Sequence, residues 1–145
     1  MSTDSSYIEQ NRASTERIRA LAALPDAALR VPVGEHWTVA ITLAHLAFWD
    51  RRVLAVLDET ERAGRLTYPP IDFTVNDIAL PFWAALPPRA AAELAVAAAE
   101  ALDHRLAHFP PVLLGELRAH NARWVVRAIH RNEHLDEVDA ALAAV

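Results

Sequence analysis

The 145-residue chain has no cysteine and only three glycines. Without cysteine the chain can form no disulfide framework, no thiolate zinc site and no thiol nucleophile of its own, so any sulfur chemistry requires an external thiol. Few glycines, many alanines and leucines, and prolines placed between periodic segments argue against strands joined by turns. We therefore expect an all-α protein.

The sequence also lacks a long uncharged apolar run and a large basic stripe. No segment approaches the length of a membrane span, so we expect no contact with a membrane. The start of the chain, residues 1–7, is polar and acidic where a signal peptide is basic and then apolar, which predicts a cytoplasmic protein. The formal charge is -5 and the arginines are dispersed, so we expect no nucleic-acid partner.

Apolar periodicity predicts four long helices and one short helix within a single domain, residues 1–145. In the first helix the inward residues are expected to be Ile8, Ile18, Leu21 and Leu24. A connection is expected at 26–36, an extended crossing at 69–73 and a short helix at 74–80, which kinks or restarts at Pro81. The long helices are expected to run from Thr3 or Ser5 to Ala23, over 38–64, over 89–108, and from Leu117 or Asn121 to Leu142.

Three of the seven histidines have the placement of metal ligands. His130 and His134 lie one helical turn apart on one face, a separation at which two imidazoles can share an ion. His45 lies in an apolar stretch of the second helix, where an imidazole needs a hydrogen-bond partner or a metal. A solvated helix face remains the alternative for the pair, and a core histidine bonded to a carbonyl for His45. His104 and His108 share the same spacing, but at a helix end, which favours surface or capping roles.

Asp50 falls on the apolar face of the second helix, where a carboxylate needs a partner. Arg127 and Arg131 share the apolar arc of the last helix, so the sequence allows a buried ion pair that supports the histidines. Trp49, Arg131 and Glu133 are further candidates for support or for a pocket wall. Other aromatic residues could line the same pocket or form ordinary core: Trp37, Phe48, Tyr68, Phe73, Phe82, Trp83 and Trp124.

Residues 35–52 (EHWTVAITLAHLAFWDRR) and 124–138 (WVVRAIHRNEHLDEV) resemble the DinB-like superfamily. That group includes the mycothiol-dependent maleylpyruvate isomerase type and the bacillithiol S-transferase type. The resemblance covers nearly the whole chain and places His45, His130 and His134 on the metal-binding positions. It implies an up-down-down-up four-helix bundle with a short helix in the long crossover, a divalent metal such as nickel or zinc, and a homodimer. It also implies mycothiol or another small thiol as cosubstrate.

These observations favour a metal-dependent enzyme that activates an external low-molecular-weight thiol for S-transfer to an electrophile or for isomerisation. A first alternative is a metal-dependent hydrolase with Glu133, Glu137 or Asp50 as acid or base. A second is a stress-associated helical bundle without catalysis, which would dimerise through alanine-rich surfaces such as residues 90–99.

Overall fold

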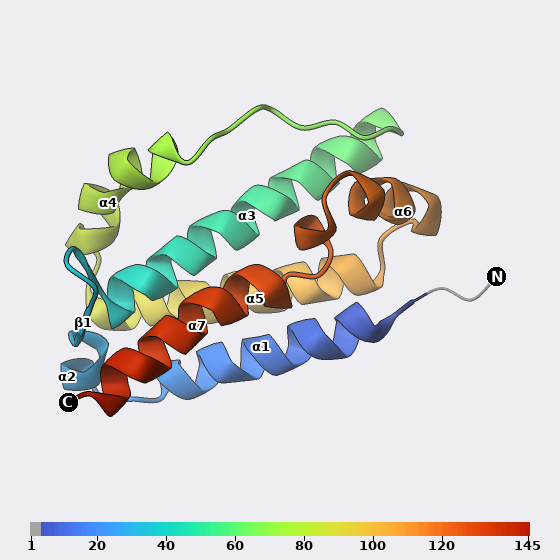
Figure 1. Ribbon diagram of the computed structural model, residues 1–145. Coiled ribbons are helices and arrows are strands. Elements are labelled where there is room, and N and C mark those ends of the chain that lie inside the picture. The colour runs from blue at the N-terminus through green and yellow to red at the C-terminus, as the bar shows by residue number, and fades with distance from the viewer. Residues whose placement is uncertain (1–3) are drawn as a thin grey trace.

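Four long helices pack side by side in the computed structural model, which describes residues 4–145 (Figure 1). Helices α1 and α7 run toward one end of the molecule, and α3 and α5 toward the other (Figure 1). Helix α3 packs against α5 and α7, and α1 packs against the same two helices. The mainly helical class is as expected, while Thr3, one possible start of the first helix, lies outside the described residues. The bounds are α1 Ser6–Ala22, α3 Val39–Ala63, α5 Pro88–Ala107 and α7 Ala128–Ala143.

A short helix and a small hairpin occupy the segment that was expected to be a plain connection. After α2 (Asp26–Leu29), strand β1 (Pro32–Val33) pairs antiparallel with β2 (Trp37–Thr38). Gly34 turns the hairpin with a positive φ of 70°, a conformation that favours glycine. The hairpin carries Trp37 to the start of α3, beside His45, with 4.8 Å between the ring centroids.

Helix α3 begins and ends where the sequence predicts. The Thr38 hydroxyl accepts a hydrogen bond from the Ile41 N–H at 3.1 Å, and Gly64 ends the helix in the left-handed conformation, with φ 73°. The helix is buried along most of one side. That side also carries polar residues, among them His45 and Asp50, and both are almost fully buried.

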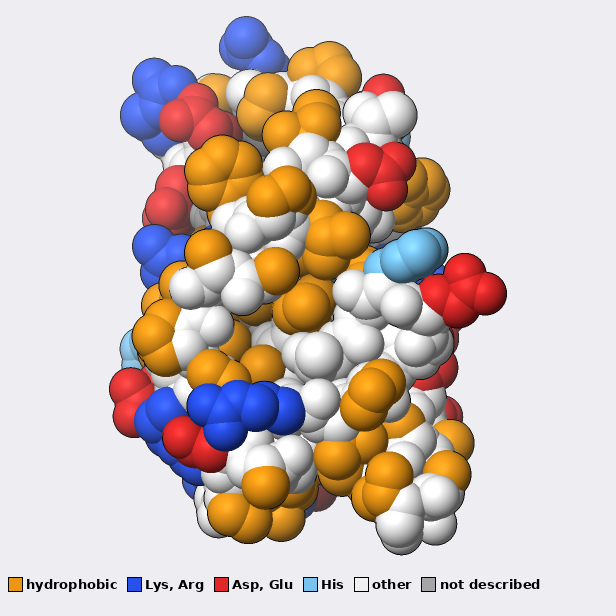
Figure 2. Space-filling model, turned by 90° about the vertical axis from the view of Figure 1, so that its left-hand side faces the viewer, with side chains coloured by type: hydrophobic (Ala, Val, Ile, Leu, Met, Phe, Trp, Pro, Cys, Tyr) orange, Lys and Arg blue, Asp and Glu red, His pale blue; other side chains and the backbone are white. Residues whose placement is uncertain are grey.

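The crossover from α3 to α5 contains one further helix, α4 (Thr74–Ala85), as expected, but it is longer than predicted. It continues through Pro81 because both Pro81 and Asp77, whose carbonyl loses its helical partner, are exposed to solvent. Figure 2 faces the end of the molecule where α4 lies and shows hydrophobic side chains over much of that surface. Phe73, Ile78 and Phe82 are among the most exposed large apolar residues.

The last predicted helix is divided into three elements, so its expected start at Leu117 or Asn121 is wrong. Helix α6 (Pro111–His120) is followed by the short 3₁₀ helix η1 (Ala122–Trp124) and then by α7. Asn121 has an extended backbone, and its side chain accepts a hydrogen bond from the Arg123 N–H at 3.1 Å, which competes with continued helix. Asn11 of α1 accepts the Ala128 N–H at 2.9 Å and so caps the start of α7.

Two expectations about helix faces are also wrong. Ile8 of α1 is 45 % exposed, because Tyr7 and Asn11 take the inward positions on that turn. The alanines within 90–99 are mostly not a free surface. Their small side chains let α5 pack closely against α3 and α1, and the buried ones are Ala91, Ala92, Ala95, Ala98 and Ala99.

Within residues 4–145, no helix combines the length and the apolar character that a membrane crossing demands.

Candidate metal centre

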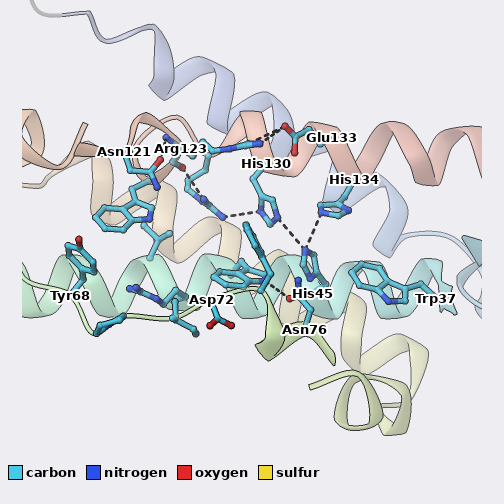
Figure 3. Close-up of a pocket in the computed structure, with 18 residues that line it drawn as sticks. Trp37, His45, Tyr68, Asp72, Asn76, Asn121, Arg123, His130, Glu133 and His134 are labelled. Atoms are coloured by element: carbon cyan, nitrogen blue, oxygen red, sulfur yellow. Dashed lines mark hydrogen bonds and ion pairs between the residues drawn. The ribbon is translucent and has the colours of Figure 1, made fainter. Parts of the chain in front are cut away.

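Three imidazoles from two helices meet at one point of the fold (Figure 3). His45 comes from the second turn of α3, and His130 and His134 come from successive turns of α7. The Nε2 atom of His45 lies 3.3 Å from Nε2 of His130 and 3.1 Å from Nε2 of His134. One potential ligand nitrogen from each ring lies within 4.8 Å of the other two. The predicted histidines therefore converge, whereas His104 and His108 lie elsewhere, in the last turn of α5 and at its C-cap.

The geometry of these nitrogens fits a divalent ion. Imidazole nitrogens about 2.0–2.1 Å from zinc in a tetrahedral site are about 3.3 Å apart, close to the separations here. Hydrogen bonding alone satisfies the group poorly, because the single Nε2 of His45 faces two other nitrogens. The buried Nδ1 atoms of His45 and His134 have no hydrogen-bond partner. A shared ion would give all three Nε2 atoms a ligand role.

The cluster favours neutral imidazoles, the form that binds metals. Burial, together with the charges of His134 and Arg127, lowers the pKa of His45 to about 3. Burial and the charge of Arg127 lower the pKa of His130 to about 2. Burial also lowers the pKa of His134, although Glu137 and Glu133 oppose the shift. The rings are therefore uncharged near neutral pH, so none has to lose the second proton of an imidazolium before it can bind an ion.

These shifts predict that the metal-free protein loses stability in mild acid. In the unfolded chain each imidazole takes up a proton near pH 6.5, as model histidines do, while the folded rings stay neutral. The unfolded state therefore binds more protons below about pH 6.5, and the free energy of unfolding falls as the pH drops. Urea unfolding midpoints between about pH 7.5 and 5 measure this slope, which should become shallower in a His45→Gln/His130→Gln variant. Equal slopes in the two proteins would contradict the neutral cluster.

A chain of contacts links His130 to the buried Asp50. Arg127 donates from Nη2 to the Nδ1 atom of His130 at 3.2 Å and from Nε to Asp50 at 2.9 Å. A guanidinium has only donors, so His130 Nδ1 accepts here and the proton of the neutral ring lies on Nε2. A neutral ring that binds an ion through Nε2 carries its proton on Nδ1 instead, so ion binding would move this proton and release the contact with Arg127. Without an ion, Arg127 holds the His130 ring in place. The buried pair of Asp50 with Arg127 that the sequence allowed is present.

Arg131 is fully buried and ties Asp50 to the other helices. Its Nε donates to Asp50 at 2.9 Å, and its Nη1 donates to Asp103 of α5 at the same distance. The same Nη1 also contacts Asn11, Ser14 and Thr15 of α1, each within 3.2 Å. Asn11, Ser14 and Thr15 were not predicted from the sequence. The feature that could have indicated them is the presence of small polar residues on the otherwise apolar face of the first helix.

The histidines lie in the wall of a cavity of about 640 Å³. Trp49 and Glu133, two of the predicted pocket residues, line it. The Trp49 indole N–H donates to Asn76 of α4 at 2.9 Å, and Glu133 is paired with Arg123. Figure 3 shows Tyr68 at one end of the cavity and Trp37 at the other. Aromatic and apolar residues of the lining are Trp37, Trp49, Val53, Tyr68, Pro70, Ile71, Phe73 and Trp124.

The aromatic predictions divide between cavity and packing. Trp37, Tyr68, Phe73 and Trp124 line the cavity, as one alternative held. Trp83 is buried behind His45, with 5.3 Å between the ring centroids. Asn76 and Arg52 are cavity residues that the sequence analysis did not identify, because nothing in the sequence indicates which side of the crossover faces α3.

The fold and this cluster define a helical bundle with a three-histidine group that could hold a divalent ion. The chain belongs to the DinB superfamily, whose family model matches residues 7–138. Searches among curated proteins and among solved structures gave no match. The match to the family model includes the cluster and confirms the resemblance drawn from residues 35–52 and 124–138.

Proposed function

We propose that the protein is an enzyme in which His45, His130 and His134 hold one divalent ion, nickel or zinc, beside a small-molecule cavity. The observation that carries the proposal is the convergence of three neutral imidazoles on the cavity wall. When bound, such an ion lowers the pKa of a coordinated thiol. The reaction proposed is S-transfer or isomerisation with mycothiol or another low-molecular-weight thiol as cosubstrate, in the cytoplasm.

The chain's own groups shape the site where the reactants would bind. Arg127 holds the His130 ring while no ion is bound, and the Trp49–Asn76 hydrogen bond fixes an aromatic wall between α3 and α4. The cavity presents mainly aromatic and apolar surface, which suits an electrophile with an apolar body. Because the chain has no cysteine, the sulfur must arrive with a substrate.

The carboxylates weigh against the hydrolase alternative, which needs a free acid or base close to the ion. Asp50 is fully buried and bound to two arginines. Glu133 is paired with Arg123, and Glu137 lies 3.8 Å from Nδ1 of His134, on the side away from Nε2. Asp50 and Glu137 do not line the cavity, and Glu133, which does, is already paired with Arg123.

The order of the four long helices supports the up-down-down-up topology proposed for the bundle (Figure 1). A homodimer is also proposed, now through the exposed apolar residues of α4 and the segment before it rather than through residues 90–99. Phe73, Ile78 and Phe82 support this choice because large apolar side chains at a surface favour association.

The enzymatic proposal is tested by measuring turnover of a chromogenic electrophile with each of a panel of small thiols, with and without added nickel or zinc. We expect turnover with at least one thiol, dependent on metal and reduced by about 100-fold or more in His134→Ala. His108→Ala, which removes an exposed histidine of the same spacing, should leave turnover unchanged. Metal-independent turnover would contradict the role of the ion. No turnover with any thiol, together with a concentration-dependent molecular weight, would favour the dimerising bundle without catalysis.

A further inference from the structure

Arg52 lies on the wall of the same cavity, seven residues beyond His45 on α3. That spacing is two helical turns, about 10 Å along the helix axis. The Arg52 Nη2 atom donates to the Pro69 carbonyl at 2.8 Å, and its guanidinium carbon lies 5.9 Å from the centre of the Trp124 ring. The guanidinium is therefore held in place at the end of the cavity that Tyr68 and Trp124 form, with 5.0 Å between their ring centroids.

The other two nitrogens of this guanidinium, Nε and Nη1, are shielded from solvent and have no hydrogen-bond partner. Burial lowers the pKa of Arg52, an effect that Tyr68 opposes, yet an arginine stays charged in proteins. Unpaired charged donors away from water are costly. This arrangement differs from the usual one, in which a buried cation has an acceptor for each donor.

The other arginines of the cavity wall are already paired. Arg123 is paired with Glu133, and Arg127 is paired with Asp50. Arg52 has no ion pair within residues 4–145. Asp72, which also lines the cavity, accepts hydrogen bonds from the backbone and hydroxyl of Thr74 instead. The cavity thus contains one positive charge that no carboxylate of the described chain neutralises.

We infer that Arg52 binds a carboxylate of the ligand that occupies the cavity, so that the substrate class is a carboxylic acid with an apolar body. A guanidinium and a carboxylate form paired, charge-assisted hydrogen bonds, and the aromatic lining accepts the apolar part. The inference rests on the proposed function in taking this cavity as the substrate site. The carboxylate belongs either to the electrophile or to the thiol, and the two sources differ in the test below.

The first experiment uses metal-free protein and the matched pair octanoate and octanol, with binding followed by tryptophan fluorescence and by calorimetry. Octanoate should bind about tenfold or more tightly than octanol, because the charged carboxylate can accept two hydrogen bonds from a guanidinium, whereas the neutral hydroxyl accepts a weaker one. Arg52→Met should abolish the preference, and Arg52→Lys should keep part of it. Arg51→Met removes an exposed arginine of the same helix and should change nothing. Thermal unfolding verifies that each variant is folded.

The second experiment identifies the source of the carboxylate with cobalt-loaded protein, whose visible absorption reports sulfur at the ion. If mercaptohexanoate binds more tightly than mercaptohexanol, and Arg52→Met removes this difference, the carboxylate belongs to the thiol. Undiminished octanoate binding in the presence of saturating mercaptoethanol places it on the electrophile. Absence of any sulfur absorption contradicts the proposed function but leaves the octanoate comparison intact. Equal affinities for octanoate and octanol, or a preference that survives in Arg52→Met, would overturn the assignment of Arg52.

Discussion

His45→Ala is expected to lower the affinity of the protein for zinc or nickel by more than about 100-fold. Loss of an outer hydrogen-bonding partner of a metal ligand already costs about 10–100-fold, and His45 is the only ligand that α3 contributes to the cluster. The two histidines of α7 would remain one turn apart, but two imidazoles alone are a much weaker site. Calorimetric titration of the metal-free protein gives the affinity directly.

The substitution should leave the fold intact. The Nδ1 atom of His45 has no hydrogen-bond partner, so its removal leaves no protein donor or acceptor unpaired at that atom. His108→Ala is the matched control, since it removes an exposed imidazole that also belongs to an i,i+4 pair. If both variants bound metal as the unsubstituted protein does, the histidine cluster would not be the metal site.

Asp50→Ala is expected to reduce the free energy of unfolding by about 3–5 kcal/mol, the range for breaking a buried ion pair by removing one partner. Asp50 is fully buried between Arg127 and Arg131, and its loss leaves two buried guanidinium groups facing each other. Burial already lowers the pKa of Arg127, the charge of Asp50 opposes this, and the charge of Arg131 adds to it. Urea unfolding of the metal-free protein measures the difference.

The control lies on the same helix. Asp58 forms an ion pair with Arg105 at 3.2 Å, but its side chain is 68 % exposed, and pairs of this kind contribute about 0–1 kcal/mol. Asp58→Ala should therefore be nearly neutral. Asp50→Asn, which keeps the shape and removes the charge, provides a measurable variant if Asp50→Ala does not fold. Losses of similar size for the variants at positions 50 and 58 would show that the buried network does not stabilise the fold.

The sequence predicts the core of the site because its signals are local. His130 and His134 are one turn apart on any helix, and His45 and Asp50 are polar residues in an apolar stretch, which require partners whatever the fold. The family resemblance then supplies the one non-local fact, that the second and last bundle helices face each other. The structure brings the three histidines within ligand distance and pairs Asp50 with both predicted arginines.

The remainder depends on contacts between distant segments. The start of α7 is set by Asn11 of the first helix, which bonds the Val125 carbonyl and the Ala128 N–H. Periodicity cannot detect such a cap, so it predicts one helix where three elements exist. Whether the alanines of residues 90–99 are buried depends in the same way on how closely α5 approaches its neighbours. The role of Arg52 depends on the path of the crossover from α3 to α5.

X-ray absorption spectroscopy of the zinc-loaded protein tests the central claim most directly, because it counts the imidazoles around the ion. The account predicts one ion per chain, with three imidazole nitrogens at about 2.0–2.1 Å and a ligand that does not come from the protein in the remaining position. A coordination shell with fewer than three imidazoles, or one unchanged when His45, His130 and His134 are all replaced, would contradict it.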